Sequence, residues 1–278
     1  MSKLLSANFA RLWKNKVFWL SMATMFVYSV VYMMNASRRG ALASSSGYHH
    51  TLDQYYFIYG ISIGIFCAVF ISLFLGTEYS DGTIRNKLIV GHTRSGIYFS
   101  NLIVCFSASM LIMAVWLITA LIGIPTLGIW EMGILGLMVY VLISIMFVAA
   151  FSAIFTFLGM ILSGKAVTAV VSILLFLGLL LFGSMIYNSV TQPEMISNVI
   201  IAVDDMPEMT DPMPNPDYIT GTKRTIYEFI MDFLPTSQGI LMMGLQVSNP
   251  LRMIVSSIFI TVVITAVGII LFRKKDLK

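Results

Sequence analysis

The sequence predicts an all-α polytopic membrane protein, with six transmembrane helices in a single domain over residues 1–278. Hydrophobic residues make up 58% of the chain and charged residues only 11%. About a quarter of the residues in a soluble domain are charged, so this chain could not cover a water-facing surface of its size. Six long apolar segments, separated by polar ones, are the second observation that indicates a bundle of membrane spans.

Each of these segments has the composition of a membrane span, which takes about 20 mostly apolar residues. They cover residues 17–34, 55–75, 100–124, 133–162, 167–187 and 253–272. The fourth is longer than a bilayer needs, so we expect it to tilt or to extend past the membrane. Only a few residues around Gly164 separate it from the fifth, which predicts a tight helical hairpin.

The distribution of basic residues predicts the orientation. With both termini in the cytoplasm, 12 of the 17 Lys and Arg residues lie in cytoplasmic segments and five in outer ones, as the positive-inside rule requires. A basic N-terminus followed by an apolar run is also typical of a secretory signal. This run is longer than the usual signal core of about 7–15 residues, so we interpret 17–34 as a first span that is retained.

The first 16 residues predict an amphipathic helix that lies at the membrane interface. Leu5, Phe9 and Leu12 recur at helical spacing, and basic residues are interspersed among them. Such a helix places its apolar side in the headgroup region and its cations near anionic lipid. The alternative is an unstructured positive tail that only fixes the topology. The residues assigned to the interfacial helix are Arg11, Trp13, Lys14 and Lys16.

Residues 76–99, between the second and third spans, form a polar cytoplasmic segment with the pattern of a short helix. Ser80 or Asp81 can cap this helix, whose apolar face holds Ile84, Leu88 and Ile89. It is too short to be stable alone, so we expect it to pack against the span ends and to present its polar side to a partner. The alternative is a loop that only satisfies the positive-inside rule. The candidate docking residues are Glu78, Asp81, Gly82 and Thr83, with Arg85, Asn86 and Lys87 facing away from the apolar side.

The outer region 188–252, between the fifth and sixth spans, has two halves. The first is rich in proline and acidic residues and has too little apolar surface for a core, so we expect an extended loop. The second has a helical pattern that Pro235 interrupts, which predicts two helices lying on or dipping into the outer leaflet. The residues assigned to this helix pair are Phe229, Phe233, Pro235 and Gln238.

Several classes of function do not fit the sequence. It has no phosphate-binding loop, nucleophile elbow or zinc-protease motif, so we expect neither ATP binding by this chain nor an enzyme. The basic residues lie at span ends and not on one face, which argues against a nucleic-acid partner. His49, His50 and Asp53 could hold a metal weakly, but two adjacent histidines rarely point at one ion, so we expect no metal.

The spans contain essentially no ionisable residue in their interiors. Asp53, Glu131 and Lys165 all lie at span ends. Ionisable residues are costly within the membrane and mark ion or proton pathways. An ion-coupled carrier would therefore lack the groups it titrates, and a driving force for transport must come from elsewhere.

Three segments resemble the permease subunits of bacterial type-2 ABC exporters. Residues 11–19 (RLWKNKVFW) are similar to their amphipathic entry helix into the first span. Residues 78–88 (EYSDGTIRNKL) are similar to their glutamate, glycine-threonine and basic pattern after the second span. Residues 232–238 (DFLPTSQ) resemble the segment before their last span, and the layout of six spans matches over the whole chain.

The resemblance implies a division of labour between subunits. Residues 78–87 would be a coupling helix that docks into a separate ABC ATPase, which binds ATP and Mg²⁺, while this chain binds no cofactor. Two ATPases and a second permease chain, identical or homologous, would complete the transporter in the bacterial cytoplasmic membrane. The helix pair around Pro235 would act as an external gate.

The spans and the outer region favour one class of cargo. The lack of charge within the spans suits a hydrophobic or amphipathic cargo, and the acidic outer region attracts cations. We therefore expect export of amphipathic or cationic peptides, such as toxins or antimicrobial peptides, or their expulsion for self-protection. The alternative function is a non-transporting membrane scaffold or sensor that recruits a cytosolic partner through the same short helix.

Overall fold

The computed structural model describes residues 2–44, 51–128, 131–196, 199–201, 207–209 and 211–276. Within these ranges, six helices are long and apolar enough to cross a membrane, which confirms the predicted all-α polytopic fold. Each predicted segment lies inside one of them, to within a residue at its ends. The candidate spans are Lys16–Ala41, Asp53–Ser80, Arg94–Gly123, Gly133–Ile161, Lys165–Val190 and Pro250–Lys274.

Most of the long helices extend beyond the apolar segments. A helix ends where its backbone hydrogen bonds end and not where hydropathy falls, so Arg38 and Arg39 remain helical. The short helix α3 (Asp53–Tyr56) begins the second span, and a 3₁₀ turn, η1 (Ala120–Gly123), ends the third and leads into α7 (Ile124–Leu127). The long helices are α2 (Lys16–Ser44), α4 (Tyr59–Ser80), α6 (Arg94–Thr119), α8 (Gly133–Ile161), α9 (Lys165–Val190) and α12 (Pro250–Lys274).

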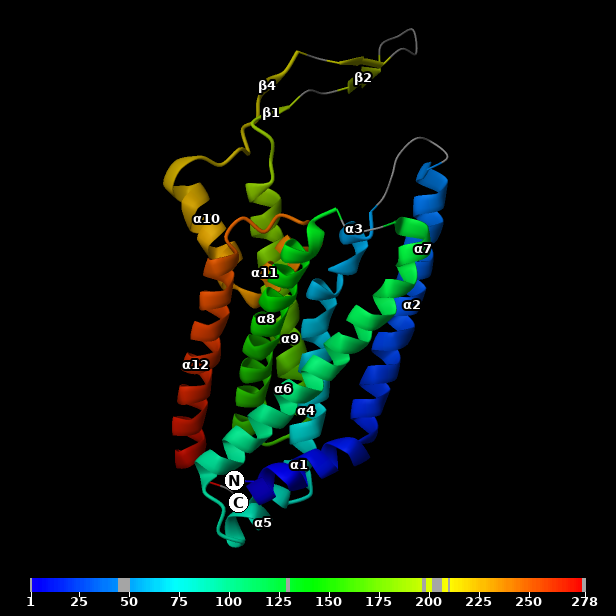
Figure 1. The fold of residues 1–278 in the computed structure, drawn as a ribbon. Coiled ribbons are helices and arrows are strands. Elements are labelled where there is room, and N and C mark those ends of the chain that lie inside the picture. The colour runs from blue at the N-terminus through cyan, green and yellow to red at the C-terminus, as the bar shows by residue number, and fades with distance from the viewer. Residues whose placement is uncertain are drawn as a thin grey trace.

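Helix α4 lies at the centre of the bundle (Figure 1). It packs against α2, α6, α8 and α9, and α12 packs on α8 and α6. Helix α8 ends at Ile161 and α9 begins at Lys165, so the predicted tight hairpin is confirmed. The buried core between these helices is rich in aromatic rings, among them Phe70, Phe74, Phe147, Phe151 and Phe155.

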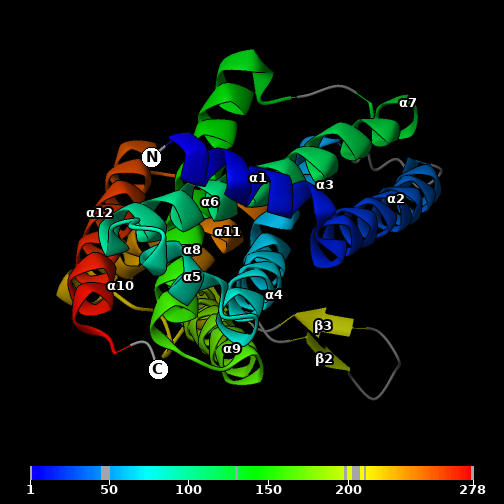
Figure 2. The same ribbon diagram turned by 90° about the horizontal axis from the view of Figure 1, so that it is seen from below.

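Two short helices lie at one end of the bundle, together with the last turn of α12. Helix α1 (Ser2–Lys14) crosses beneath the bundle and packs on α6, with Leu4, Asn8 and Leu12 buried (Figure 1, Figure 2). Helix α5 (Thr83–Ile89) follows α4 after a tight turn. We call this end of the bundle the α5 end.

The opposite end, which we call the α10 end, holds α10 (Gly221–Phe233) and α11 (Pro235–Met243). The predicted break is confirmed: Leu234 between the two helices has an extended backbone, as a residue before proline usually has. Helix α11 is buried against α4, α8 and α9 and does not lie on the lipid-facing surface, which differs from the expected position. An apolar pattern alone cannot distinguish a lipid environment from a protein interior. The hydroxyl group of Thr236, which donates to the carbonyl oxygen of Leu179 in α9 at 3.1 Å, is one contact that favours the interior.

Short strands occupy the first half of the outer region, where we expected only an extended loop. Strand β1 (Met195–Ile196) pairs antiparallel with β4 (Met213–Pro214), and β2 (Val199–Ile201) pairs antiparallel with β3 (Pro207–Met209). These pairs project from the α10 end (Figure 1). The strand pairs satisfy their backbone hydrogen bonds locally and need no hydrophobic core of their own. A segment with too little apolar surface for a core can therefore still form them.

Helix α11 contacts α4 backbone to backbone. A Cβ atom placed on Gly239 would lie 2.1 Å from the carbonyl oxygen of Gly60, and one placed on Gly60 would lie 2.9 Å from the Cα atom of Gly239. Both distances are shorter than the contacts that real Cβ atoms make. The neighbouring atoms belong to the backbone, so they cannot move away as a flexible side chain could. Glycine therefore allows the close approach of these helices, as small residues commonly do in membrane proteins.

We expect Gly239→Ala to lower the melting temperature of the purified chain or to prevent folding, because the added methyl group overlaps the backbone of Gly60. Gly178→Ala in α9 is the matched control, since nothing lies within 4 Å of its Cβ position. Thermal melts in detergent, followed by size-exclusion chromatography, compare the two variants. Equal stability would contradict the tight contact.

Candidate functional site

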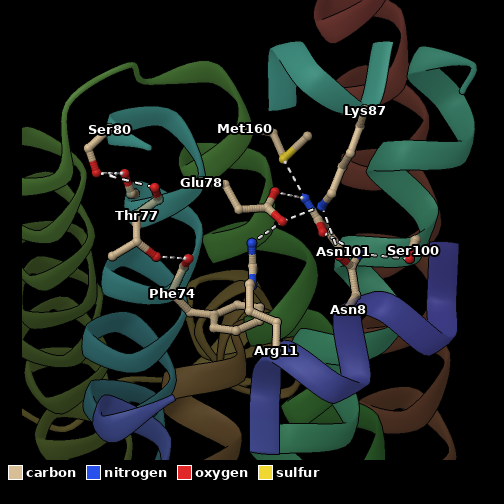
Figure 3. A network of polar contacts seen from close by, with 11 residues as sticks. Asn8, Arg11, Phe74, Thr77, Glu78, Ser80, Lys87, Ser100, Asn101 and Met160 are labelled. Carbon is tan, nitrogen blue, oxygen red and sulfur yellow. Dashed lines mark hydrogen bonds and ion pairs between the residues drawn. The ribbon is translucent and has the colours of Figure 1, made fainter. Parts of the chain in front are cut away.

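Glu78 is a buried carboxylate at the α5 end, in the last turn of α4 (Figure 3). Its Oε1 atom accepts hydrogen bonds from Nη1 of Arg11 and Nζ of Lys87, and both contacts are ion pairs. Its Oε2 atom accepts a hydrogen bond of 2.7 Å from Nδ2 of Asn101. Both carboxylate oxygens are therefore paired, as a buried charge requires.

Asn8 connects the partners of Glu78 to one another. Its Nδ2 atom donates to Oγ of Ser100 and to Oδ1 of Asn101, each at 2.8 Å. Its Oδ1 atom accepts a hydrogen bond of 2.8 Å from Nζ of Lys87. These contacts join α1, α4, α5 and α6 through one set of polar side chains. We call this set the Glu78 cluster: Asn8, Arg11, Glu78, Lys87 and Asn101.

Cations outnumber the single carboxylate in this cluster. Arg11 and Lys87 both pair with Glu78, which leaves one positive charge in excess. The guanidinium carbon of Arg11 also lies 3.9 Å from the ring centroid of Phe74, a cation–π contact that offsets part of the cost of burying it. Burial lowers the pKa of Lys87, and the Glu78 carboxylate opposes this shift. Without Glu78, two cations would face each other in a buried site.

The end of α12 is attached to the same region. Nζ of Lys275 donates to Oη of Tyr79 at 3.0 Å and to the carbonyl oxygen of Met160 at 3.2 Å. Nη1 of Arg94 donates at 3.1 Å to a carbonyl oxygen in the last turn of α12. Met160 connects this contact to the Glu78 cluster, because its sulfur lies 3.4 Å from Nδ2 of Asn101.

Helix α5 presents a mixed polar and apolar surface away from the bundle. It begins at Thr83, after Gly82, whose φ of 66° is a left-handed conformation that glycine adopts without strain. Ile84 is buried and faces the bundle. Adjacent exposed apolar side chains outside the spans form apolar surface that a partner can cover. The outward residues of α5 are Arg85, Asn86 and Ile89, and the exposed residues Asp81 and Val90 flank the helix; Ile89 and Val90 are exposed to 73% and 77%.

Four expectations for this segment need correction. Glu78 lies in α4 and is buried, so it is not part of the exposed surface. Lys87 turns inward, because the Glu78 carboxylate attracts its ammonium group. Ile89 is exposed and does not pack on the bundle. Neither Ser80 nor Asp81 caps α5, since a left-handed glycine precedes it.

Helix α1 has an inward and an outward side, so the first residues do not form an unstructured tail. Leu12 is buried, whereas Trp13 and Lys14 are exposed. The helix ends at Lys14, so Lys16, which is also exposed, is the first residue of α2. Arg11 was expected at the membrane interface, but its guanidinium group turns inward to the Glu78 cluster. The Arg11 guanidinium group therefore pairs with the buried carboxylate of Glu78 and not with lipid headgroups.

At the α10 end, Gln238 fixes α11 to its neighbours. Its Nε2 atom donates to the carbonyl oxygens of Asp232 at 2.8 Å and Met253 at 3.1 Å, and its Oε1 atom accepts from Oγ of Ser257 at 2.8 Å. The buried carboxylate of Asp232 also forms an ion pair with Arg252 at 3.1 Å. These contacts tie α10, α11 and α12 together.

The four residues predicted for the helix pair lie in two different environments. The rings of Phe229 and Phe233 stack with centroids 5.9 Å apart, and Phe229 is exposed. Pro235 and Gln238 are buried within the bundle. The structure therefore places them on one helix pair but does not bring them together in one cluster.

The sequence patterns did not identify the amides of the Glu78 cluster as site residues. Asn8 lies four residues from both Leu4 and Leu12, so it shares the buried side of α1. Asn101 is the second residue of the predicted third span, 100–124. A polar side chain on an apolar helix face is costly to bury unless it forms hydrogen bonds. The position of each asparagine on an apolar face was therefore a sign in the sequence that its amide is hydrogen-bonded.

Asp53 stabilises the start of α8. Its Oδ2 atom accepts hydrogen bonds from the backbone N–H groups of Glu131 at 2.6 Å and Met132 at 3.2 Å. The two residues considered with it as metal ligands, His49 and His50, lie outside the described residues.

Residues 4–183 match a family model described as ABC-2 family transporter protein. This range is more than half of the chain and contains the whole Glu78 cluster. The chain belongs to the ABC-2 transporter family. No curated protein and no solved structure is significantly similar to it.

Family membership gives this ABC-2 permease a general function. It is a multi-pass membrane component of an ABC transporter, and it acts together with an ABC ATPase. The resemblance seen in the sequence is confirmed at the level of the family. Helices α10, α11 and α12 lie beyond the matched range.

We expect Glu78→Gln to destabilise the permease, because an amide cannot neutralise Arg11 and Lys87. Removing one partner of a buried ion pair costs about 3–5 kcal/mol. Asp81→Asn removes the same charge at an exposed position three residues later and serves as the matched control. Thermal unfolding in detergent measures both variants, and equal melting temperatures would show that the Glu78 cluster does not hold this end together.

Burial lowers the pKa of Lys275 to about 8, from an ordinary value of 10.5. Above pH 8 the folded chain therefore loses this proton while the unfolded chain keeps it, so the unfolded state binds more protons and stability rises with pH. We expect the wild type to gain thermal stability relative to Lys275→Met between pH 8 and pH 10.5. A difference that stays constant across this window would contradict burial of the amine.

Proposed function

We propose that this ABC-2 permease is the membrane subunit of an ATP-driven exporter in the bacterial cytoplasmic membrane. Two copies of an ABC ATPase and a second permease chain, identical or homologous, complete the transporter. ATP and Mg²⁺ bind to the ATPase, and this chain binds no cofactor. The distribution of the 17 basic residues supports an orientation with the α5 end and both termini in the cytoplasm. The α10 end then faces outward.

The observation that carries this proposal is the position of the Glu78 cluster between the outward face of α5 and the bundle. We assign the docking surface to the outward residues of α5, which combine an apolar tip with polar neighbours as protein interfaces commonly do. Behind this surface, Lys87 connects α5 to Glu78, and Arg11 connects α1 to the same carboxylate. A displacement of α5 by the ATPase therefore moves α1 and the ends of α4 and α6 with it.

We propose that α10 and α11 form the external gate, with Phe229, Phe233, Pro235 and Gln238 as its residues. Two contacts support a link between this gate and the rest of the bundle. Gly239 of α11 lies against Gly60 of α4, and Gln238 donates to a carbonyl oxygen of α12. Closure of the ATPase pair on ATP would bring the two coupling helices together and open the gate for cargo.

The cargo that we propose is a hydrophobic or amphipathic peptide of the toxin or antimicrobial kind. Away from their ends, the six spans carry no charged residue, which suits a cargo with apolar surface. Residues 188–232 contain eight acidic residues against Lys223 and Arg224, and this negative region attracts a cationic peptide on the outer side.

The alternative function, a scaffold or sensor, would use the same surface of α5 without transport. Membership of the ABC-2 family favours the transporter. The two functions differ in one measurable property, because only a transporter has a nucleotide hydrolysis that depends on docking.

We expect Arg85→Glu to abolish the lipid-dependent ATP hydrolysis of the permease co-purified with its ATPase in nanodiscs, because it reverses a charge on the docking surface. Arg273→Glu makes the same change at an exposed position in the last turn of α12, at the same end of the bundle, and should leave hydrolysis intact. Hydrolysis that is indifferent to Arg85, or a permease that retains no ATPase, would favour the scaffold.

A further inference from the structure

A groove lies between α10 and α12 on the outside of the bundle, beside the stacked phenylalanines of α10. Its volume is about 600 Å³, within the range of roughly 300–1,000 Å³ that small-molecule sites occupy. Its walls are largely apolar and include Phe229, Val255 and Phe259, which are 51%, 56% and 57% exposed. Within the described residues, about half of the surface of each of these side chains is left uncovered.

The groove changes from polar to apolar along α12. Asn249 and Arg252 line it where the helix begins, and Val255 and Phe259 line it one and two turns further along. At 1.5 Å of rise per residue, Arg252 and Phe259 are roughly 10 Å apart along the helix axis. A cation at the membrane surface with apolar side chains below it complements a phospholipid, whose phosphate lies above its acyl chains.

Arg252 has hydrogen-bond donors left for a phosphate. Its Nη1 atom donates to Oδ2 of Asp232, and its side chain is 42% exposed. A guanidinium group has five N–H donors in a planar fork that fits phosphate oxygens, and the other donors of Arg252 reach no acceptor in the described part of the chain. Asp232 neutralises part of its charge, and the positive end of the α12 dipole adds to the attraction for an anion.

We propose that this groove binds an anionic phospholipid of the outer leaflet, with the phosphate on Arg252 and an acyl chain against Val255 and Phe259. The choice of leaflet rests on the orientation given by the proposed function. A second copy of this chain fits the groove less well, because interfaces between membrane helices favour small and apolar residues, and the mouth of the groove holds Arg252 and Asn249. The bound lipid contacts both α10 and α12, so it stabilises α10, one of the two helices of the proposed gate.

Native mass spectrometry of the delipidated full-length permease tests this site, with phosphatidylglycerol or phosphatidylcholine added as the probe. We expect phosphatidylglycerol to bind more tightly and to raise the melting temperature more. Arg252→Gln should weaken its binding about tenfold, because a charge-assisted contact with the phosphate is lost. Arg224→Gln removes the same charge from α10 outside the groove and should leave binding unchanged.

A second variant is needed because Arg252→Gln also breaks the ion pair with Asp232. Val255→Trp fills the groove and leaves that pair intact, so it should abolish phosphatidylglycerol binding while the lipid-free melting temperature stays the same. Equal binding of the two lipids, or binding that Val255→Trp does not change, would overturn the proposal. A dimer mass that Val255→Trp removes would assign the groove to a second copy and would also overturn it.

These readouts separate the lipid site from the proposed exporter function. Lipid binding is measured on the permease without its ATPase, so the lipid-binding result does not depend on whether the permease supports coupled ATP hydrolysis. The leaflet is tested separately by labelling Ser248→Cys with an impermeant thiol reagent on intact cells. Ser248 is exposed two residues before α12 begins, and the native Cys67 and Cys105 are buried. Labelling from outside is expected, and protection from the reagent would place the groove in the inner leaflet.

Discussion

The carboxylate of Glu78 determines how the α5 end of this permease is arranged. It pairs with Arg11 of α1 and Lys87 of α5, and it accepts a hydrogen bond from Asn101 of α6. A buried charge is tolerated only when it is paired and hydrogen-bonded, so these segments hold positions that satisfy it. Helix α5 has only seven residues and could not persist alone. Its place depends on Glu78 more than on helix propensity.

The two ends of the bundle are connected by α12, which is fixed at both. At the α10 end, the carbonyl oxygen of Met253 accepts a hydrogen bond from Gln238. At the α5 end, Lys275 donates to Tyr79 and Met160. Packed helices and hydrogen bonds of this kind can carry energetic coupling between distant sites. The continuity supports the proposal that docking at α5 affects the helices of the outer gate.

Most of the fold could be predicted from the sequence because the membrane allows few alternatives. A span in lipid must be helical and about 20 residues long, so hydropathy alone located the six helices and the hairpin at Gly164. The cluster could not be predicted in the same way. Lys87 turns inward toward a carboxylate on another helix, and Asn8 completes the site from α1. Periodicity within one helix contains no information about such partners.

In this interpretation α1 and α5 move as one body when the ATPase binds nucleotide. Pulsed electron paramagnetic resonance between spin labels at Ser6→Cys in α1 and Asn86→Cys in α5 tests this most directly, because both positions are exposed and both native cysteines are buried. Asn86 lies on the proposed docking surface, so the labelled permease must first be shown to retain its ATPase and the coupled hydrolysis. The complex would carry labels on one permease chain and be measured with and without trapped ATP. We expect the same narrow distance distribution in both states, and a broader one in a Glu78→Gln background. A wild-type distance that shifts on nucleotide binding would contradict a rigid link through Glu78.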